Sequence, residues 1–196
     1  MAISLALQRP EEDGQTVRPT PALRAIVDDA TAPRAGPADA DVTIVLFTDY
    51  QCAVCRATDP ALERLIDRDR RVRVIFKDWP IFGANSVMAA RVAMAADRQG
   101  KYLALHRALM TSHEPINAAT LPAIAARAGV DWAKLAADLA AHGTEIDTAL
   151  AAHAREARSL GLQGTPGYLI GPYLVRSGLR DGPLKRKVAA ARRSAS

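Results

Sequence analysis

Cys52 and Cys55 are the only cysteines in this chain of 196 residues, and two residues separate them. An apolar, β-branched run precedes them at residues 42–47, and a segment with helical spacing of apolar residues follows. We therefore expect the pair at a strand-to-helix junction. There, unpaired backbone N–H groups and the positive end of the helix dipole favour thiolate over thiol. A thiolate is the nucleophile of disulfide exchange, and a second sulfur one turn further on can close a ring with it. The placement predicts redox chemistry.

Three other interpretations of the cysteine pair compete with this one. A zinc site needs two further ligands, and the four histidines form no close pair: His106, His113, His142 and His153. A purely structural disulfide across so short a loop would stabilise the fold little. The cysteines could also be inert apolar fillers. We favour the redox interpretation and expect neither a metal nor a cofactor.

Composition limits the class of protein. The apolar fraction of 49% suits a globular chain of one domain, or of one domain with an inserted subdomain. The net charge is +5, and the basic excess gathers after residue 175, where we expect a solvated helix or a weak surface for anions. Aromatic residues do not alternate with basic ones, so we expect no nucleic-acid binding. Residues 1–7 are apolar but lack the features of a signal peptide.

The first half of the chain predicts a β-α-β unit. Residues 1–22 are expected to be a flexible N-terminal segment, because residues 8–22 are rich in proline, glycine and polar residues. Residues 23–27 predict a short edge strand. A buried strand at 42–48, a helix at 52–68 that Pro60 should kink, and a strand at 71–77 follow.

The second half predicts helices and then two strands. Glycine and capping residues delimit five alanine-rich helices, at 85–99, 101–110, 118–128, 131–141 and 145–160. Short strands at 167–170 and 173–175 and a helix at 181–191 complete the chain. The predicted fold class is α/β: a mixed β-sheet flanked by helices (residues 23–83 and 162–193) with an inserted all-helical subdomain (84–161).

Thr165 and Pro166 form a second candidate element. A proline that opens a strand is a position where a cis peptide bond can occur, although a tight turn would give the same pattern.

Three stretches together resemble the DsbA-like thiol–disulfide oxidoreductases. They are Phe47-Thr48-Asp49-Tyr50-Gln51-Cys52-Ala53-Val54-Cys55-Arg56, Phe76-Lys77-Asp78-Trp79-Pro80-Ile81-Phe82-Gly83 and Gly164-Thr165-Pro166-Gly167-Tyr168-Leu169-Ile170-Gly171. The resemblance covers residues 23–190 in the right order. It implies a thioredoxin-like fold with a helical insertion, and a location in the periplasm or cell envelope.

The resemblance also implies roles for individual residues. Cys52 would be the exposed nucleophile and Cys55 its buried partner. Thr165 and Pro166 would lie against the dithiol and offer backbone to an extended substrate chain, a mode of binding that tolerates many sequences.

Two departures from the family pattern affect the expected chemistry. Ala53 and Val54 between the cysteines are apolar, so we expect a milder depression of the Cys52 pKa than in the strong oxidants of the family. Many relatives carry an acid six residues before the first cysteine, where this chain has Leu46. Asp49 or Lys77 could act as a modulator in its place.

The leading hypothesis is an enzyme that exchanges disulfides with unfolded or partly folded cysteine-containing proteins. We expect a monomer that works with a redox partner protein, either soluble or membrane-bound. Two alternatives stay open: a chaperone-like binding module without redox turnover, and a glutathione-linked enzyme on the same scaffold.

Overall fold

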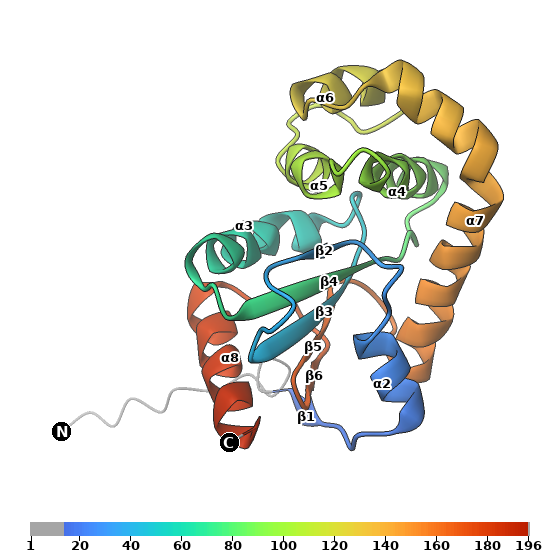
Figure 1. The fold of residues 1–196 in the computed structure, drawn as a ribbon. Coiled ribbons are helices and arrows are strands. Elements are labelled where there is room, and N and C mark those ends of the chain that lie inside the picture. Colours follow the sequence, from blue (N-terminus) through green and yellow to red (C-terminus); the bar gives the residue numbers. More distant parts are fainter. Residues whose placement is uncertain (1–13, 196) are drawn as a thin grey trace.

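A six-stranded mixed sheet forms the centre of the protein (Figure 1). The structure is a computed structural model that describes residues 14–195. The strands lie in the order β1-β6-β5-β3-β4-β2. Their bounds are β1 Gln15–Thr16, β2 Arg34–Ala35, β3 Val42–Thr48, β4 Val72–Asp78, β5 Gly167–Ile170 and β6 Tyr173–Val175. Only β3 and β4 are parallel, and the other pairs in this sheet are antiparallel.

Seven helices pack around the sheet in the described part of the chain. They are α2 Pro21–Val27, α3 Ala53–Arg68, α4 Ala84–Asp97, α5 Tyr102–Met110, α6 Leu121–Arg127, α7 Trp132–Ser159 and α8 Asp181–Ala195. Figure 1 shows α3 and α8 on one side of the sheet, and α2 with the C-terminal half of α7 on the other. Because both faces are covered, β3 is apolar along almost its whole length.

The alternation of side chains along the central strands assigns residues to the two faces. Leu46 of β3 and Phe76 of β4 belong to the larger core cluster, which contains both cysteines. Val45 and Ile75 point the other way, into the smaller cluster under α2 and α7. This alternation decides which side chains of β3 and β4 reach the cysteines.

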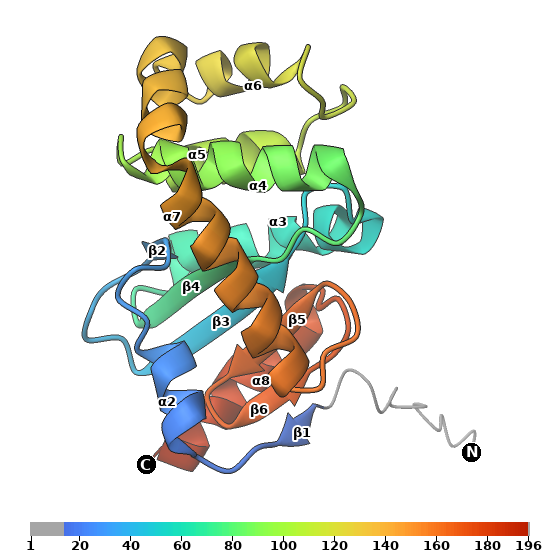
Figure 2. The same cartoon turned by 90° about the vertical axis from the view of Figure 1, so that its right-hand side faces the viewer.

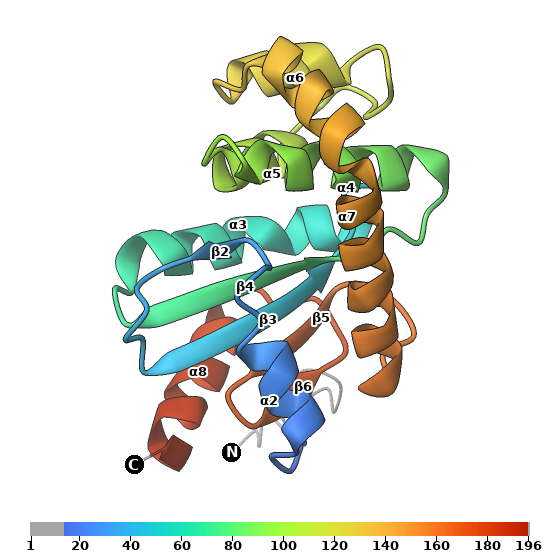
Figure 3. The same ribbon diagram turned by 45° about the vertical axis from the view of Figure 1, so that its right-hand side comes forward.

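The segment between β4 and β5 contributes the helices α4 to α7. Helix α5 packs on α3, α4 packs beside α5, and α6 lies beyond them (Figure 2). The helix α7 then returns from α6 past α4 to the opposite face of the sheet (Figure 3). One long helix thus joins the helical insertion to the sheet.

The prediction of an edge strand at residues 23–27 is wrong, because these residues belong to helix α2. The Thr20 side chain accepts a hydrogen bond from Leu23 N (3.1 Å), and Pro21 occupies the first helical turn. A hydroxyl cap followed by proline is a helix start signal, and a stretch of five residues is too short for its periodicity to outweigh that signal.

The predicted break between residues 141 and 145 is also wrong, because α7 is one helix of 28 residues. Gly143 lies inside it, with ordinary helical backbone rather than the positive φ that ends a helix. A Cβ at this position would lie 2.9 Å from the Arg91 guanidinium. Gly143 therefore leaves room for the Arg91 side chain of α4 and does not end the helix.

Part of the segment 1–22, which was predicted to be flexible, is ordered. Residues 15 and 16 form β1 and pair with β6, and α2 begins at Pro21. Residues 1–13 lie outside the described part of the chain. The predicted strands at 167–170 and 173–175 have the bounds of β5 and β6.

Candidate active site

Cys52 occupies the N-cap position of α3, directly after β3. Its Sγ accepts a hydrogen bond from the backbone N–H of Cys55 at 3.2 Å. The first-turn N–H groups of a helix have no partner within the helix, and here one of them points at the sulfur. Both cysteines are free thiols in this structure.

The pKa values of the two thiols are shifted in opposite directions. The side-chain hydrogen bond between the cysteines lowers the pKa of Cys52 most and outweighs its burial; with further bonds from Thr165 and the backbone, the pKa falls to about 6. Burial raises the pKa of Cys55 far above that of an ordinary thiol, and the side-chain bond with Cys52 raises it further. Near neutral pH, Cys52 is therefore the thiolate and Cys55 the proton-bearing thiol.

The expectation that Cys52 is exposed is wrong. Cys52 and Cys55 are each 3% exposed. The neighbouring loop accounts for part of this cover, because Cys52 Sγ lies 3.2 Å from the carbonyl oxygen of Thr165. As whole residues the two cysteines are equally buried, and their thiols differ in hydrogen bonding and acidity.

The loop before β5 brings Thr165 and Pro166 to the dithiol, although the chain separates them from Cys52 by more than a hundred residues. The Thr165–Pro166 peptide bond is cis. The hydroxyl oxygen of Thr165 is buried and has no hydrogen-bond partner among the described residues, and the Thr165 side chain beside the sulfurs lowers the pKa of both cysteines.

Asp49 fixes the loop between β3 and Cys52. Its carboxylate accepts hydrogen bonds from the backbone N–H groups of Gln51 (2.7 Å), Ile81 (2.7 Å) and Phe82 (3.2 Å), and from the Ser86 hydroxyl (2.7 Å). The side chain is 2% exposed. Asp49 thus ties the cysteine loop to the segment between β4 and α4, which is a structural function.

We predict that Asp49→Ala lowers the free energy of unfolding by about 3 kcal/mol, because buried donors that lose their acceptor cost about 1–3 kcal/mol each. Urea denaturation followed by circular dichroism measures the change. The exposed Asp39 provides the matched control, and Asp39→Ala should leave the midpoint in place. Equal midpoints for the two variants would contradict this function of Asp49.

The other predicted modulators lie in different surroundings. Ala53 and Val54 are exposed in the first turn of α3, with Val54 51% exposed. Lys77 is fully buried, and its ammonium group pairs with Asp29 (2.5 Å) and Glu156 (2.9 Å). These partners belong to the α2 and α7 side of the sheet, opposite the cysteines. Lys77 therefore holds the layers together there.

The acidity of Cys52 predicts the pH dependence of its alkylation. We expect the rate of reaction with iodoacetamide at Cys52 to be half-maximal near pH 6 and to fall as the pH drops below 6, because only the thiolate reacts. Thr165→Val removes the hydroxyl group and should move the midpoint to higher pH. A midpoint near pH 8.5, the value of a free thiol, would contradict the hydrogen bonding described here.

A chain of buried polar groups that the sequence did not predict extends from β4 to α3. Tyr102 of α5 donates to Asp78 (3.1 Å) and lies 3.4 Å from the Tyr50 hydroxyl, which lies 3.1 Å from Nδ1 of His106. His106 Nε2 lies 3.0 Å from Asp59 Oδ1. Burial raises the pKa of Asp78 to about 7. Few sequence signals point to these residues, since tyrosine and histidine in apolar helices are common core residues.

Asp59, Glu63 and His106 are metal-ligand types whose atoms lie within 4.8 Å of one another. These groups already have protein partners: Asp59 bonds to His106, and Glu63 pairs with Arg107. They form an ion-pair network, which is a weaker basis for a metal site than free ligands would be.

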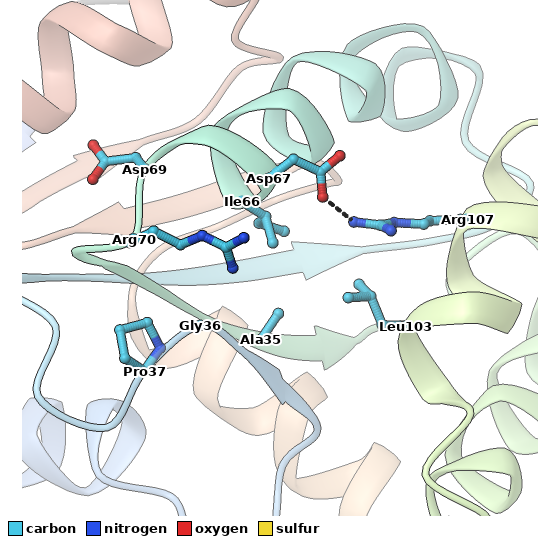
Figure 4. Close-up of a pocket in the computed structure, with 9 residues that line it drawn as sticks. All are labelled: Ala35, Gly36, Pro37, Ile66, Asp67, Asp69, Arg70, Leu103 and Arg107. Carbon is cyan, nitrogen blue, oxygen red and sulfur yellow. Dashed lines mark hydrogen bonds and ion pairs between the residues drawn. The ribbon is translucent and has the colours of Figure 1, made fainter.

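A pocket of about 650 Å³ opens at the far end of α3 (Figure 4). Ile66, Asp67 and Arg70 line it from the α3 side, and Leu103 and Arg107 from α5. Ile66 follows Cys52 by fourteen residues, so the pocket lies roughly 20 Å along the helix from the cysteines. This cavity is separate from the dithiol.

Residues 43–179 match the DSBA-like thioredoxin domain family. The match spans more than half of the chain and includes both cysteines and the Thr165–Pro166 loop. The chain belongs to this family, and its fold is the thioredoxin-like fold predicted from the sequence.

Solved structures agree with this assignment. The chain is 36% identical to a thioredoxin-like oxidoreductase from Silicibacter pomeroyi, with a TM-score of 0.81 over 86% of this chain and 96% of that one. The thiol-disulfide exchange protein α-DsbA2 from Wolbachia pipientis is 27% identical, with a TM-score of 0.81 over 85% and 90%. The catalytic domain of ScsC from Proteus mirabilis is 28% identical, with a TM-score of 0.79 over 88% and 97%.

Curated relatives include much longer proteins. The chain is 27% identical over 150 residues to a Na⁺/H⁺ antiporter NhaA of Salinispora tropica, covering 72% of this chain and 23% of the antiporter. The chain thus spans about a quarter of that relative. Among the described residues, no helix is long and apolar enough to cross a membrane.

Proposed function

We propose that this protein is a thiol–disulfide oxidoreductase that acts on cysteine-containing proteins, with Cys52 as the nucleophile. One observation carries the proposal: Cys52 caps α3 as a stabilised thiolate beside a thiol that keeps its proton. A substrate disulfide is attacked by the Cys52 thiolate, and a mixed disulfide forms. Cys55 then closes the Cys52–Cys55 disulfide and releases the reduced substrate. The reverse sequence oxidises a substrate dithiol.

The surface around the dithiol supports unfolded or partly folded proteins as substrates. Among the described residues, four large apolar side chains are notably exposed: Val54 (51%), Ile81 (39%), Phe82 (54%) and Val87 (39%). Val54 belongs to the first turn of α3, and the backbone N–H groups of Ile81 and Phe82 bind Asp49, three residues before Cys52. Exposed apolar side chains on the segments that flank the dithiol loop suit the apolar segments that unfolded chains expose. The loop of Thr165 and Pro166 would then bind substrate backbone.

The proposal extends to location and partners. A cell-envelope location is favoured because a structural neighbour at 28% identity is a periplasmic thioredoxin-like protein from Salmonella enterica. A turnover in one direction requires a redox partner protein that restores Cys52 and Cys55 after each reaction. Ion antiport is not assigned to this chain, which spans only about a quarter of its antiporter relative.

The test is to trap the mixed disulfide. Cys55→Ser removes the resolving thiol, so the reduced variant should form a covalent adduct with an unfolded protein that contains a disulfide. Non-reducing electrophoresis and mass spectrometry should find a 1:1 adduct through Cys52 that dithiothreitol reverses. The double variant Cys52→Ser/Cys55→Ser is the control. If Cys55→Ser forms no more adduct than the double variant, the proposed function is wrong.

A further inference from the structure

Closure of the Cys52–Cys55 disulfide requires Cys55 to lose its proton, and the family's usual acceptor position holds Leu46. Cys55 is 3% exposed, so bulk water has little access to its sulfur. The two nearby candidates named from the sequence do not serve. The Asp49 carboxylate is occupied by four hydrogen bonds, and Lys77 pairs with carboxylates across the sheet.

Asp59 offers a carboxylate oxygen on the right face of the helix. It follows Cys55 by four residues on α3, and residues spaced in this way lie one above the other. Asp59 is 4% exposed. Its Oδ1 lies 3.0 Å from His106 Nε2, whereas its Oδ2 is buried without a hydrogen-bond partner among the described residues. A buried carboxylate oxygen without a donor is free to accept a proton.

The strand register locates Asp59 and His106 over the position of the missing acid. Leu46 is paired with Phe76 on one side and Tyr168 on the other. The Phe76 ring lies 4.8 Å from the His106 ring, measured between centroids, and His106 holds Asp59. His106, and through it Asp59, therefore lies against Phe76, the β4 neighbour of position 46.

Tyr168 gives independent support for this placement. Burial is the main cause that raises the pKa of Tyr168, and the charges of Cys55 and Asp59 raise it further. A hydrogen bond with the Thr58 side chain acts in the opposite direction. The charges of Cys55 and Asp59 therefore both act on Tyr168, the β5 residue that pairs with Leu46.

We propose that Asp59 accepts the Cys55 proton during disulfide closure, with His106 of the helical insertion as the positioning residue; this inference rests on the proposed function. In the mixed disulfide, the Cys55 S–H bond breaks and the proton passes to Asp59 Oδ2. The Cys55 thiolate attacks Cys52 Sγ, the Cys52–Cys55 bond forms, and the substrate sulfur leaves as a thiolate with the electron pair of the broken bond. The dithiol is oxidised and the substrate reduced.

The test separates attack by Cys52 from closure by Cys55. Reduced protein is mixed with 5,5′-dithiobis(2-nitrobenzoate) in a stopped-flow instrument. Attack by Cys52 releases one thionitrobenzoate and closure by Cys55 releases a second, so absorbance at 412 nm rises in two phases. We expect Asp59→Asn to leave the first phase within twofold of wild type and to slow the second at least about tenfold at pH 7, because a general base contributes about 10²–10⁴-fold.

Two further variants make the result specific. Asp67→Asn makes the same change two turns further along α3, on an exposed residue, and should leave both phases unchanged. Asp59→Glu keeps a carboxylate and should retain most of the second phase. An unchanged second phase in Asp59→Asn, or an equal loss in Asp59→Glu, would overturn the inference.

Circular dichroism checks that the variants fold. If Asp59→Asn fails to fold, the pH dependence of closure in the wild type decides. A closure rate that is nearly constant between pH 6 and 8 supports an internal base. A closure rate that rises tenfold per pH unit overturns the inference. Failure of the proposed function gives a different result, because wild-type protein would then show no rapid first phase.

Discussion

Cys52→Ser is expected to abolish disulfide exchange, with the rate of insulin reduction by dithiothreitol falling to the uncatalysed background. The reason is that Cys52 alone combines a pKa of about 6 with a position at the helix start, and serine at this pH is neither ionised nor able to form a disulfide. Turbidity of the insulin B chain measures the rate.

The control for this variant is Ala57→Ser, which introduces the same side chain at an exposed position of α3 and should retain activity. The chaperone-like alternative is tested in the same experiment. If the wild type shows no catalysis and Cys52→Ser fully retains any effect on substrate aggregation, the result would favour a binding module over an enzyme.

Lys77→Met is expected to lower the free energy of unfolding by about 3–5 kcal/mol, the cost of removing one partner of a buried ion pair. Lys77 is fully buried between Asp29, which follows α2, and Glu156 of α7. Burial is the largest single influence and would raise the pKa of Asp29, but the hydrogen bonds from Lys77 and Thr31 and the charge of Lys77 together outweigh it and hold that pKa far below its usual range. Methionine fills the space but leaves both carboxylates without their cation.

Urea denaturation of the oxidised proteins measures this loss. Lys134→Met is the matched control, because Lys134 pairs with Asp138 at the surface of α7, where a pair contributes at most about 1 kcal/mol. If Lys77→Met unfolds at the same urea concentration as Lys134→Met, the ion pair does not hold the layers together.

The sequence predicted the parts of the fold that depend on local chemistry. The β-branched run of β3, the alternation in β4 and the position of Cys52 before a helix all follow from residue types and spacing. The bounds of β5 and β6 were predicted because glycine and proline punctuate both strands.

The errors arose where packing between distant segments decides the structure. The stretch at 23–27 is apolar enough for either a strand or a helix, and the cap at Thr20 decides for the helix. Gly143 was predicted to end a helix because glycine often does so. The reason for a glycine inside α7, which is its contact with the Arg91 side chain of α4, is visible only in the folded structure.

The candidate site shows the same division between local and distant signals. Spacing alone identified Cys52 and Cys55, and resemblance to a family added Thr165 and Pro166. Neither approach found the link between Asp59 and His106, which are 47 residues apart in the chain and meet only when α5 packs on α3. The four-residue spacing from Cys55 to Asp59 is the one sequence signal that could have pointed to it.

The central claim is that Cys52 and Cys55 form a reversible redox couple with a stabilised thiolate. Equilibration of the protein with glutathione buffers of different ratios, followed by alkylation and mass spectrometry, measures its reduction potential. A Cys52 pKa of about 6 lies between those of strong oxidants and thioredoxin, so the account predicts a potential between about −120 and −270 mV. A pair that stays reduced in fully oxidised glutathione, or a potential more negative than that of thioredoxin, would contradict it.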